Sequence, residues 1–330
     1  MKILTIIVPT YNMEKYLQRC LDSLIIEDRK LLDTLEVIVV NDGSKDSSSK
    51  IAHVYEDKYP SVFHVIDKEN GNYGSCVNVG IEHAKGKYLR LLDADDWFEK
   101  DELLHYLRKL LDIDTCDIVI TNYTKQYSDG KYKTLLARNI DYGKIYDMNT
   151  MDFCELKNSD MLWMHAISLN TKFAQNIGWE NQTGISYTDA EYCYFPLSYA
   201  ETICFLNINL YQYFLGREGQ TVSEEGVKKG QQAFYKVGIR LLKDYNDRQF
   251  TEHRKKSLSL IISNVVYNIY ANHLIFSKKN PFLDFFEEIN MEVNKSKTVY
   301  NLVNKFTYKK IPYVLLWKYL GIKMSFFFGK

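Results

Sequence analysis

The chain has 330 residues, long enough for one domain of ordinary size and a second, smaller unit. Hydrophobic residues make up 46% and charged residues 25% of the sequence, which excludes a fibrous or largely disordered chain. The formal net charge is zero, so we do not expect a dedicated nucleic-acid-binding protein, which needs a basic surface.

The zero net charge conceals a basic tail. Residues 251–330 contain 13 Lys and Arg but 5 Asp and Glu. Within that tail, residues 305–330 hold six lysines, no acidic residue and several aromatic side chains. Such a segment is typical of a peripheral contact with an anionic membrane surface. The alternative is packing on the protein itself or on a second copy in a homo-oligomer.

Six cysteines lie scattered along the chain without C-x-x-C spacing: Cys20, Cys76, Cys116, Cys154, Cys193 and Cys204. They predict buried free thiols and therefore a reducing, cytoplasmic environment. The N-terminus shows neither the apolar core nor the cleavage site of a secretion signal. Residues 257–276 carry no Asp, Glu, Lys or Arg, but polar side chains interrupt them, so we expect a buried helix rather than a membrane span.

In chain order, short apolar segments alternate with segments of helical periodicity. Strands are predicted at residues 4–8, 35–40, 62–66, 88–92 and 117–121, and helices at 13–24, 46–59, 73–84 and 101–111. Apolar strands that alternate with helices predict a parallel sheet covered by helices on both faces. Ligands of such sheets bind beyond the carboxyl ends of the strands.

The alternation of strands and helices stops after Tyr123. Residues 124–149 predict hairpins or loops, residues 201–214 predict one strand or a pair, and residues from 224 onward are helical in pattern. We therefore expect an α/β domain at residues 1–222, with halves at 1–123 and 124–222. A basic, aromatic helical region follows at 223–330.

Polar side chains follow each of the first four strands. The loops are residues 9–12 (Pro-Thr-Tyr-Asn), 41–44 (Asn-Asp-Gly-Ser), 67–71 (Asp-Lys-Glu-Asn-Gly) and 93–96 (Asp-Ala-Asp-Asp). The three carboxylates of the last loop repel one another unless a cation such as Mg²⁺ or Mn²⁺ neutralises them. The sequence contains neither the G-x-G-x-x-G fingerprint nor a G-x-x-x-x-G-K-[ST] phosphate loop, so a nucleotide must be held differently.

These loops, in this order, resemble glycosyltransferase family 2. The resemblance spans about residues 3–215 and rests on five segments: 8–12 (Val-Pro-Thr-Tyr-Asn), 40–44 (Val-Asn-Asp-Gly-Ser), 70–81 (Asn-Gly through Asn-Val-Gly-Ile), 92–96 (Leu-Asp-Ala-Asp-Asp) and 188–191 (Thr-Asp-Ala-Glu). It implies the GT-A fold, a Rossmann-like α/β architecture with a mostly parallel sheet and helices on both faces. In this chain a C-terminal helical unit would follow.

The resemblance also implies roles for individual residues. Pro9, Tyr11 and Asn12 look like the wall of a uridine pocket, and Asp42 looks like the acceptor of the uracil N3 hydrogen. Asp93 and Asp95 resemble the family's D-x-D pair, which contacts the ribose or sugar and holds Mn²⁺ or Mg²⁺. The implied donor site is completed by Lys68, Asn70, Gly71, Asn78, Ala94 and Arg217.

The sequence departs from the family pattern at two positions. Thr188 stands where the acidic motif commonly has Glu, directly before Asp189, which resembles the catalytic base. Val77 replaces an Arg, which leaves open the cation that meets the sugar or diphosphate. The candidates are Lys68, Arg90 and Arg217.

Four further residues have two interpretations each. Asp96 either caps the following helix or binds metal. Trp163, His165 and Trp179 lie in the region where relatives commonly build the acceptor site. Aromatic faces stack on sugar rings, so these three side chains form either a saccharide platform or ordinary buried packing.

Together these features predict a metal-dependent, inverting transferase that moves a hexose or N-acetylhexosamine from a UDP-sugar to a saccharide hydroxyl. The acceptor would be a growing surface polysaccharide or a lipid-linked or protein-linked glycan. A sugar hydroxyl is a poor nucleophile at neutral pH, so a carboxylate must take its proton. A single base opposite the leaving group implies one displacement with inversion. The alternative is a non-catalytic partner that keeps the nucleotide pocket and activates another transferase.

Overall fold

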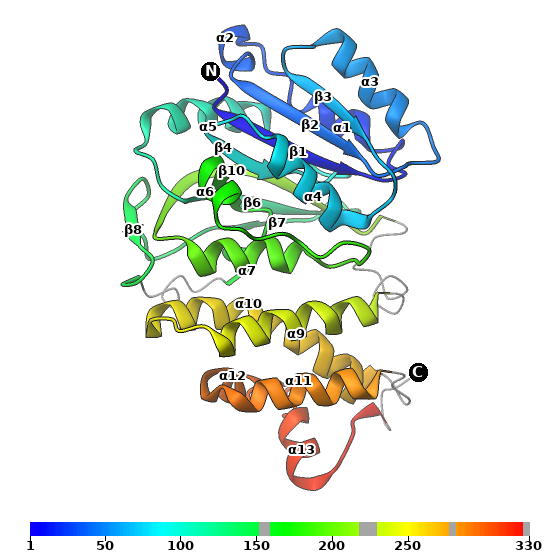
Figure 1. Ribbon diagram of the computed structural model, residues 1–330, viewed down its shortest axis with the longest axis vertical. Coiled ribbons are helices and arrows are strands. Elements are labelled where there is room, and N and C mark those ends of the chain that lie inside the picture. Colours follow the sequence, from blue (N-terminus) through cyan, green and yellow to red (C-terminus); the bar gives the residue numbers. More distant parts are fainter. Residues whose placement is uncertain (152–158, 218–229, 277–281, 326–330) are drawn as a thin grey trace.

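The computed structural model describes residues 1–151, 159–217, 230–276 and 282–325 (Figure 1). Its centre is a ten-stranded sheet with the order β3-β2-β1-β4-β9-β6-β10-β5, in which β7 pairs with β6 and β8 with β10. The strands are β1 (Leu4–Thr10), β2 (Leu35–Asn41), β3 (Phe63–Asp67), β4 (Tyr88–Leu91), β5 (Trp97–Phe98), β6 (Ile118–Tyr127), β7 (Tyr132–Leu135), β8 (Ile145–Asp147), β9 (Ile167–Asn170) and β10 (Thr202–Leu215).

The first four strands along this order are parallel, as the sequence predicts. Every residue of β1, β2 and β4 is buried, because these largely apolar strands are covered on both faces. Ile7 of β1 pairs with Ile38 of β2 and with Leu91 of β4. This register brings the loops that follow these strands to one edge of the sheet.

The second half of the sheet is mixed. The predicted fifth strand is β6, but β9 lies between it and β4 and runs antiparallel to both. β10 is one strand of 14 residues, parallel to β6, and its register shifts between Leu206 and Tyr211. β5 pairs antiparallel with the far edge of β10. The length of β10 carries its tyrosines past the ends of the parallel strands.

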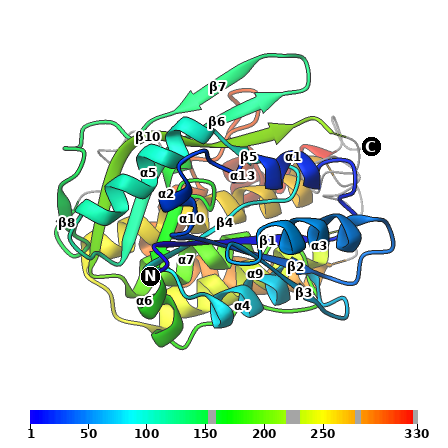
Figure 2. The ribbon, with the colours of Figure 1, turned by 90° about the horizontal axis from the view of Figure 1, so that it is seen from above.

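Helices cover both faces of the sheet. Figure 2 shows α4 and α6 on one side of the parallel strands and α1, α3 and α5 on the other. Gly80 lets α4 approach β1 closely, since a Cβ at this position would lie 2.3 Å from Ile7 Cγ2. The helices of this domain are α1 (Leu17–Asp22), α2 (Arg29–Leu32), α3 (Ser48–Lys58), α4 (Asn72–His83), α5 (Lys100–Asp112), α6 (Thr171–Asn176) and α7 (Asp189–Tyr199), with a 3₁₀ turn η2 (Ser159–Leu162).

Further helices lie below α7 in successive tiers, with α9 and α10 next to it, α11 and α12 below them and α13 at the bottom (Figure 1). They are α9 (Gln231–Asp247), α10 (Glu252–Ala271), the π-helical turn η3 (Asn272–Phe276), α11 (Leu283–Lys295), α12 (Lys297–Val303) and α13 (Tyr313–Leu320). Within the described residues, Glu252–Phe276 is the one helical stretch with the length and apolar composition of a membrane span. Of its apolar window, 67% is buried inside the protein, as in a core helix.

The cysteines of the described residues are buried free thiols: Cys20, Cys76, Cys116, Cys193 and Cys204. Cys154 lies outside the described residues.

Candidate active site

A cavity of about 260 Å³ opens at the carboxyl edge of the parallel strands. Its wall comes from the loops after β1, β2 and β4, the start of α4, the end of β10 and the segment that leads into α7. Asp42, Asp93, Asp95 and Asp189 all line this cavity. Carboxylates that are up to about half the chain apart in sequence therefore meet in one pocket.

Asp42 is a buried carboxylate with three donors around it. Lys68 Nζ lies 2.6 Å from Oδ1, the Gly71 backbone N–H donates to the same oxygen at 2.8 Å, and Asn70 Nδ2 donates to Oδ2 at 3.0 Å. Lys68 also donates to Ser75 Oγ at 2.9 Å. These contacts fix the carboxylate in place and commit the Lys68 ammonium to it.

Asp93 lines the same cavity, in the loop that follows β4. The Tyr73 hydroxyl donates to its Oδ1 at 2.9 Å, and its own backbone N–H donates to the Tyr211 hydroxyl at 3.1 Å. Burial, followed by the charge of Asp95, raises the pKa of Asp93 to about 7. A carboxylate with such a raised pKa gains from a bound cation.

Asp96 is not a helix cap, so the first of its two interpretations from the sequence is wrong. Helix α5 begins at Lys100 with Glu99 at its N-cap. The Asp96 carboxylate accepts from the Tyr211 hydroxyl at 2.6 Å and from the Phe214 N–H at 2.7 Å, so it fastens β10 to the acidic loop. Burial, followed by the charges of Asp95 and Asp93, raises its pKa.

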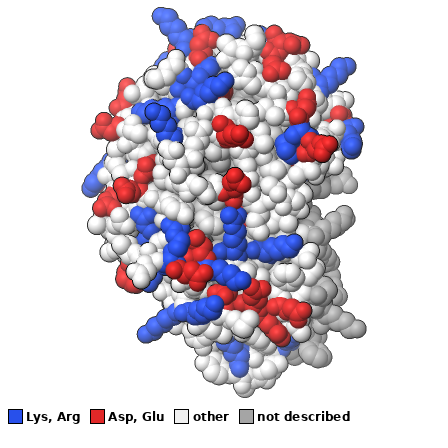
Figure 3. All heavy atoms as spheres, viewed as in Figure 1, with Lys and Arg blue, Asp and Glu red and all other residues white. Residues whose placement is uncertain are grey.

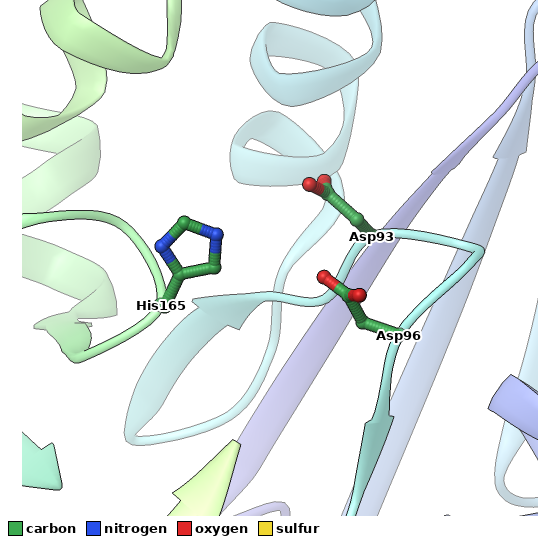
Figure 4. A group of neighbouring side chains, drawn as sticks. All are labelled: Asp93, Asp96 and His165. Carbon is green, nitrogen blue, oxygen red and sulfur yellow. The ribbon is translucent and has the colours of Figure 1, made fainter. Parts of the chain in front are cut away.

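His165 lies close to Asp93 and Asp96. Figure 4 shows one ring nitrogen turned toward the two carboxylates, and ligand atoms of all three residues lie within 4.8 Å of one another. The ring stacks on Tyr123 at 5.2 Å between centroids and lies tilted against Tyr213 at 4.0 Å. Burial lowers the pKa of His165 to about 3, so the imidazole is neutral.

Asp189 is the first residue of α7 and lines the same cavity. Burial raises its pKa to about 6, although two backbone hydrogen bonds at the helix N-terminus lower it. A carboxylate with a pKa near neutrality that remains ionised at pH 7 is suited to accept a proton.

Comparison with known protein families agrees with this site. Residues 5–175, more than half of the chain, match the family described as "Glycosyl transferase family 2". The chain belongs to glycosyl transferase family 2.

Curated glycosyltransferases match part of the chain. The chain is 34% identical over 145 residues to the glycosyltransferase GlyA of Streptococcus pneumoniae serotype 4, which covers 44% of this chain and 20% of GlyA. It is 40% identical over 125 residues to the putative glycosyltransferase EpsH of Bacillus subtilis, covering 38% of this chain and 35% of EpsH. The matched region is thus about a third or less of the length of these relatives.

Solved structures match over nearly the whole length of this chain. TarS 1–349 of S. aureus in complex with UDP-GlcNAc superposes with a TM-score of 0.64 at 18% identity, over 92% of this chain and 84% of that one. The mannosyltransferase PcManGT of Pyrobaculum calidifontis, in complex with GDP-Man and Mn²⁺, gives 0.51 at 14% identity, over 90% and 82%. These matches show the GT-A fold that the sequence predicts.

The pocket of the transferase collects most of the residues predicted from the family motifs. Those that line it are Pro9, Tyr11, Asp42, Asn70, Asp93, Ala94, Asp95, His165, Asp189 and Arg217. Its lining also includes Tyr73, Met164, Tyr187 and Tyr213, which we did not select from the sequence. The one sequence signal for Tyr213 is its position two residues after Tyr211, on the same face of a strand.

Several predicted residues lie beside the pocket rather than in its wall. Asn12 and Gly71 stabilise the loops through hydrogen bonds. Asn12 Oδ1 accepts from the Lys45 N–H at 2.7 Å, and the Gly71 N–H donates to Asp42 Oδ1. The Asn78 side chain is paired with the backbone of Asn181, at 2.9 and 2.8 Å.

The two tryptophans follow the packing interpretation in this structure. Trp179 is buried and stacks on Phe195 at 6.3 Å between centroids, and Trp163 packs against the core. Neither belongs to the lining of the cavity, whereas His165 does.

The three candidate cations are also separated. Arg90 is buried beneath the site and donates to the His165 carbonyl and to Ser168 Oγ at 3.3 Å, so it does not reach the cavity. Lys68 is bound to Asp42. Arg217, at the end of β10, lines the cavity and forms an ion pair with Asp95.

Proposed function

We propose that the chain is an inverting transferase that moves a sugar from a UDP-sugar to a saccharide hydroxyl. The observation that carries this proposal is the pairing, in one pocket, of a carboxylate of raised pKa, Asp189, with the acidic loop at Asp93 and Asp95. The structurally similar TarS binds UDP-GlcNAc and UDP, which supports a nucleotide-sugar donor.

In the proposed reaction the chain's own residues bind, orient and accept a proton. Asp42, fixed by Lys68 and Gly71, accepts the uracil N3 hydrogen. Arg217 leaves Asp95 for the diphosphate, whose negative charge grows as the leaving group departs. Asp189 takes the proton of the acceptor hydroxyl as its oxygen forms the bond to the anomeric carbon. The bond from that carbon to the diphosphate oxygen breaks in the same step, which inverts the configuration.

The residues of the pocket fit a divalent cation. Asp93, Asp96 and His165 offer two carboxylates and a neutral imidazole whose ligand atoms lie within 4.8 Å of one another. Asp95, the ligand expected from the sequence, lines the same cavity and is paired with Arg217. Carboxylates with an imidazole suit Mn²⁺. A bound cation would stabilise the charge of the departing diphosphate.

A panel of UDP-sugars tests the proposal. The protein is incubated with UDP-glucose, UDP-galactose, UDP-GlcNAc and UDP-GalNAc, with Mn²⁺ or with EDTA, and UDP release is measured. We expect hydrolysis of at least one donor with Mn²⁺ and its loss in EDTA. UDP binding without hydrolysis or transfer from any nucleotide sugar would favour the non-catalytic alternative.

We further propose that the C-terminal end contacts an anionic membrane from the cytoplasmic side, where a lipid-linked acceptor would lie. Tyr319, Leu320 and Ile322 are 74%, 64% and 41% exposed, and no Asp or Glu follows Glu292 in the sequence. At the tip formed by α13, Figure 3 shows Lys and Arg without Asp or Glu. Exposed apolar groups among lysines match the headgroup region of such a membrane. Residues 326–330 of the predicted segment lie outside the described residues.

A further inference from the structure

Tyr187, two residues before Asp189, has an unusual backbone conformation. Its φ is 65°, in the left-handed region that aromatic residues rarely adopt. Such a conformation costs free energy and persists where the surrounding structure holds the residue in place. Tyr187 also lines the cavity of the active site, so the strained turn is part of the pocket wall.

Helix α9 of the C-terminal unit holds the ring of Tyr187. The ring stacks on Phe234 with 3.8 Å between centroids and 24° between planes. Gly230, the N-cap of α9, lies against the ring edge, since a Cβ at Gly230 would lie 2.0 Å from Tyr187 Cε2. The absence of a side chain at Gly230 therefore makes room for the ring.

Helix α9 also contacts the residues that follow Asp189 in the chain. Glu191, two residues after Asp189, is fully buried and forms an ion pair with Arg240 of α9 at 3.0 Å. Arg240 also donates to the Glu180 carbonyl at 2.9 Å. One turn further along, the Tyr194 hydroxyl donates to Asp244 of α9 at 2.9 Å. The contacts advance in the same direction along α7 and α9, so the two helices are joined at several points around the start of α7.

We propose that α9 positions the catalytic base, with Tyr187 and Phe234 as positioning residues that hold Asp189 through its flanking backbone. The inference rests on the proposed function, because it assigns Asp189 the role of base. It gives the C-terminal helical unit a part in the chemistry. The donor loops at Asp42 and Asp95 belong to other elements, so loosening the Tyr187 stack should affect proton transfer more than donor binding.

Phe234→Ala removes the stack and leaves the donor loops intact. With the donor found in the UDP-sugar panel, we expect kcat for hydrolysis to fall at least tenfold. The donor KM and the Kd of UDP should stay within twofold. Phe234→Tyr keeps both rings of the stack and should restore kcat to within twofold of the wild type. Gly230→Ala should act in the same direction as Phe234→Ala, because the new Cβ displaces the ring.

Phe285→Ala is the matched control. Phe285, on α11, is a half-buried aromatic of the same helical unit that packs on Tyr235 of α9 with 6.2 Å between centroids. This variant should lose stability without the selective fall in kcat. The proposal is overturned if Phe234→Ala keeps its kcat, or if Phe285→Ala lowers kcat equally.

Crystal structures of the wild type and of Phe234→Ala separate this inference from the proposed function. If the wild type hydrolyses no nucleotide sugar, the proposed function fails, and the structures still decide the geometry. We expect Tyr187 to leave its positive φ and Asp189 to shift in the variant. If Tyr187 and Asp189 do not move in the variant, the proposed positioning of Asp189 by α9 is contradicted.

Discussion

The guanidinium of Arg217 forms an ion pair with the carboxylate of Asp95, across 122 residues of the chain. Both residues line the cavity, and the Arg217 guanidinium also lies over the Tyr16 ring at 5.4 Å. An arginine fork binds a carboxylate and a phosphate in the same way, so the group that pairs with Asp95 here can exchange it for a diphosphate.

Arg217→Ala should therefore weaken both donor binding and turnover. We expect the donor KM to rise about tenfold and kcat to fall about 100-fold, because charge on the leaving group loses its cation. Arg217→Lys keeps the charge but not the fork and should be intermediate. Steady-state kinetics of UDP release measure both constants. Arg138→Ala, at an exposed position, is the control, and equal effects in the two variants would contradict the assignment.

Asp189→Asn should abolish the chemistry and spare nucleotide binding. The amide cannot accept the hydroxyl proton, so we expect transfer and hydrolysis to fall by about 10²- to 10⁴-fold. The Kd of UDP, measured by calorimetry, should change less than twofold, because in the proposed site Asp42, on another loop, would hold the uracil. Wild-type activity in this variant would show that another group is the base, and unchanged behaviour in the cell would favour the non-catalytic partner role.

With saturating Mn²⁺, the pH dependence should report the environment of Asp189, because a bound cation would keep Asp93, whose pKa is raised to about 7, ionised. Burial raises its pKa to about 6, and the base acts only when ionised. Activity is thus present above about pH 6, and log kcat/KM should fall with unit slope as the pH drops below it. A pH profile of UDP release between pH 4.5 and 8 tests this, with stability followed separately. An acid limb near pH 4, the ordinary range of a carboxyl group, would contradict the buried base.

Lys68→Met should destabilise the protein. The Asp42 carboxylate is almost fully buried, and its ion pair with Lys68 at 2.6 Å would be lost. Removing one charged donor from a buried carboxylate costs about 2 kcal/mol, which urea unfolding can resolve. Lys45→Met removes an exposed ammonium nearby and should change the free energy of unfolding by less than about 0.5 kcal/mol.

The membrane contact can be tested at a tight turn of the C-terminal region. Lys309 and Lys310 are exposed between Tyr308 and Ile311, which form an isolated β-bridge. Reversing both charges should weaken binding to vesicles that contain phosphatidylglycerol at least about 30-fold, at about 1 kcal/mol for each lysine. Cosedimentation measures the affinity. Lys131→Glu with Lys133→Glu, on the loop and strand of the β7 hairpin, is the control. Equal binding by all three proteins would exclude this surface.

The sequence was sufficient for the alternation of strands and helices up to Tyr123 and for the gathering of the acidic loops. The buried, continuous apolar runs of β1, β2 and β4 and the periodicity of the helices between them depend on residues near one another in the chain. A parallel sheet built from such units must place Asp42 and Asp93 at the same edge, because all its strands end there.

Tertiary structure decided how the groups at that edge are paired. No local pattern places β9 between β4 and β6, sends Arg217 to Asp95, buries Trp179 on Phe195, or brings Phe234 of α9 to the ring beside Asp189. Each of these contacts joins segments distant in sequence, and its partner is fixed by how whole elements pack. The types of residue at the site can thus be predicted from neighbouring residues in the chain. Which partner each of these residues contacts is decided by the packing of the folded chain.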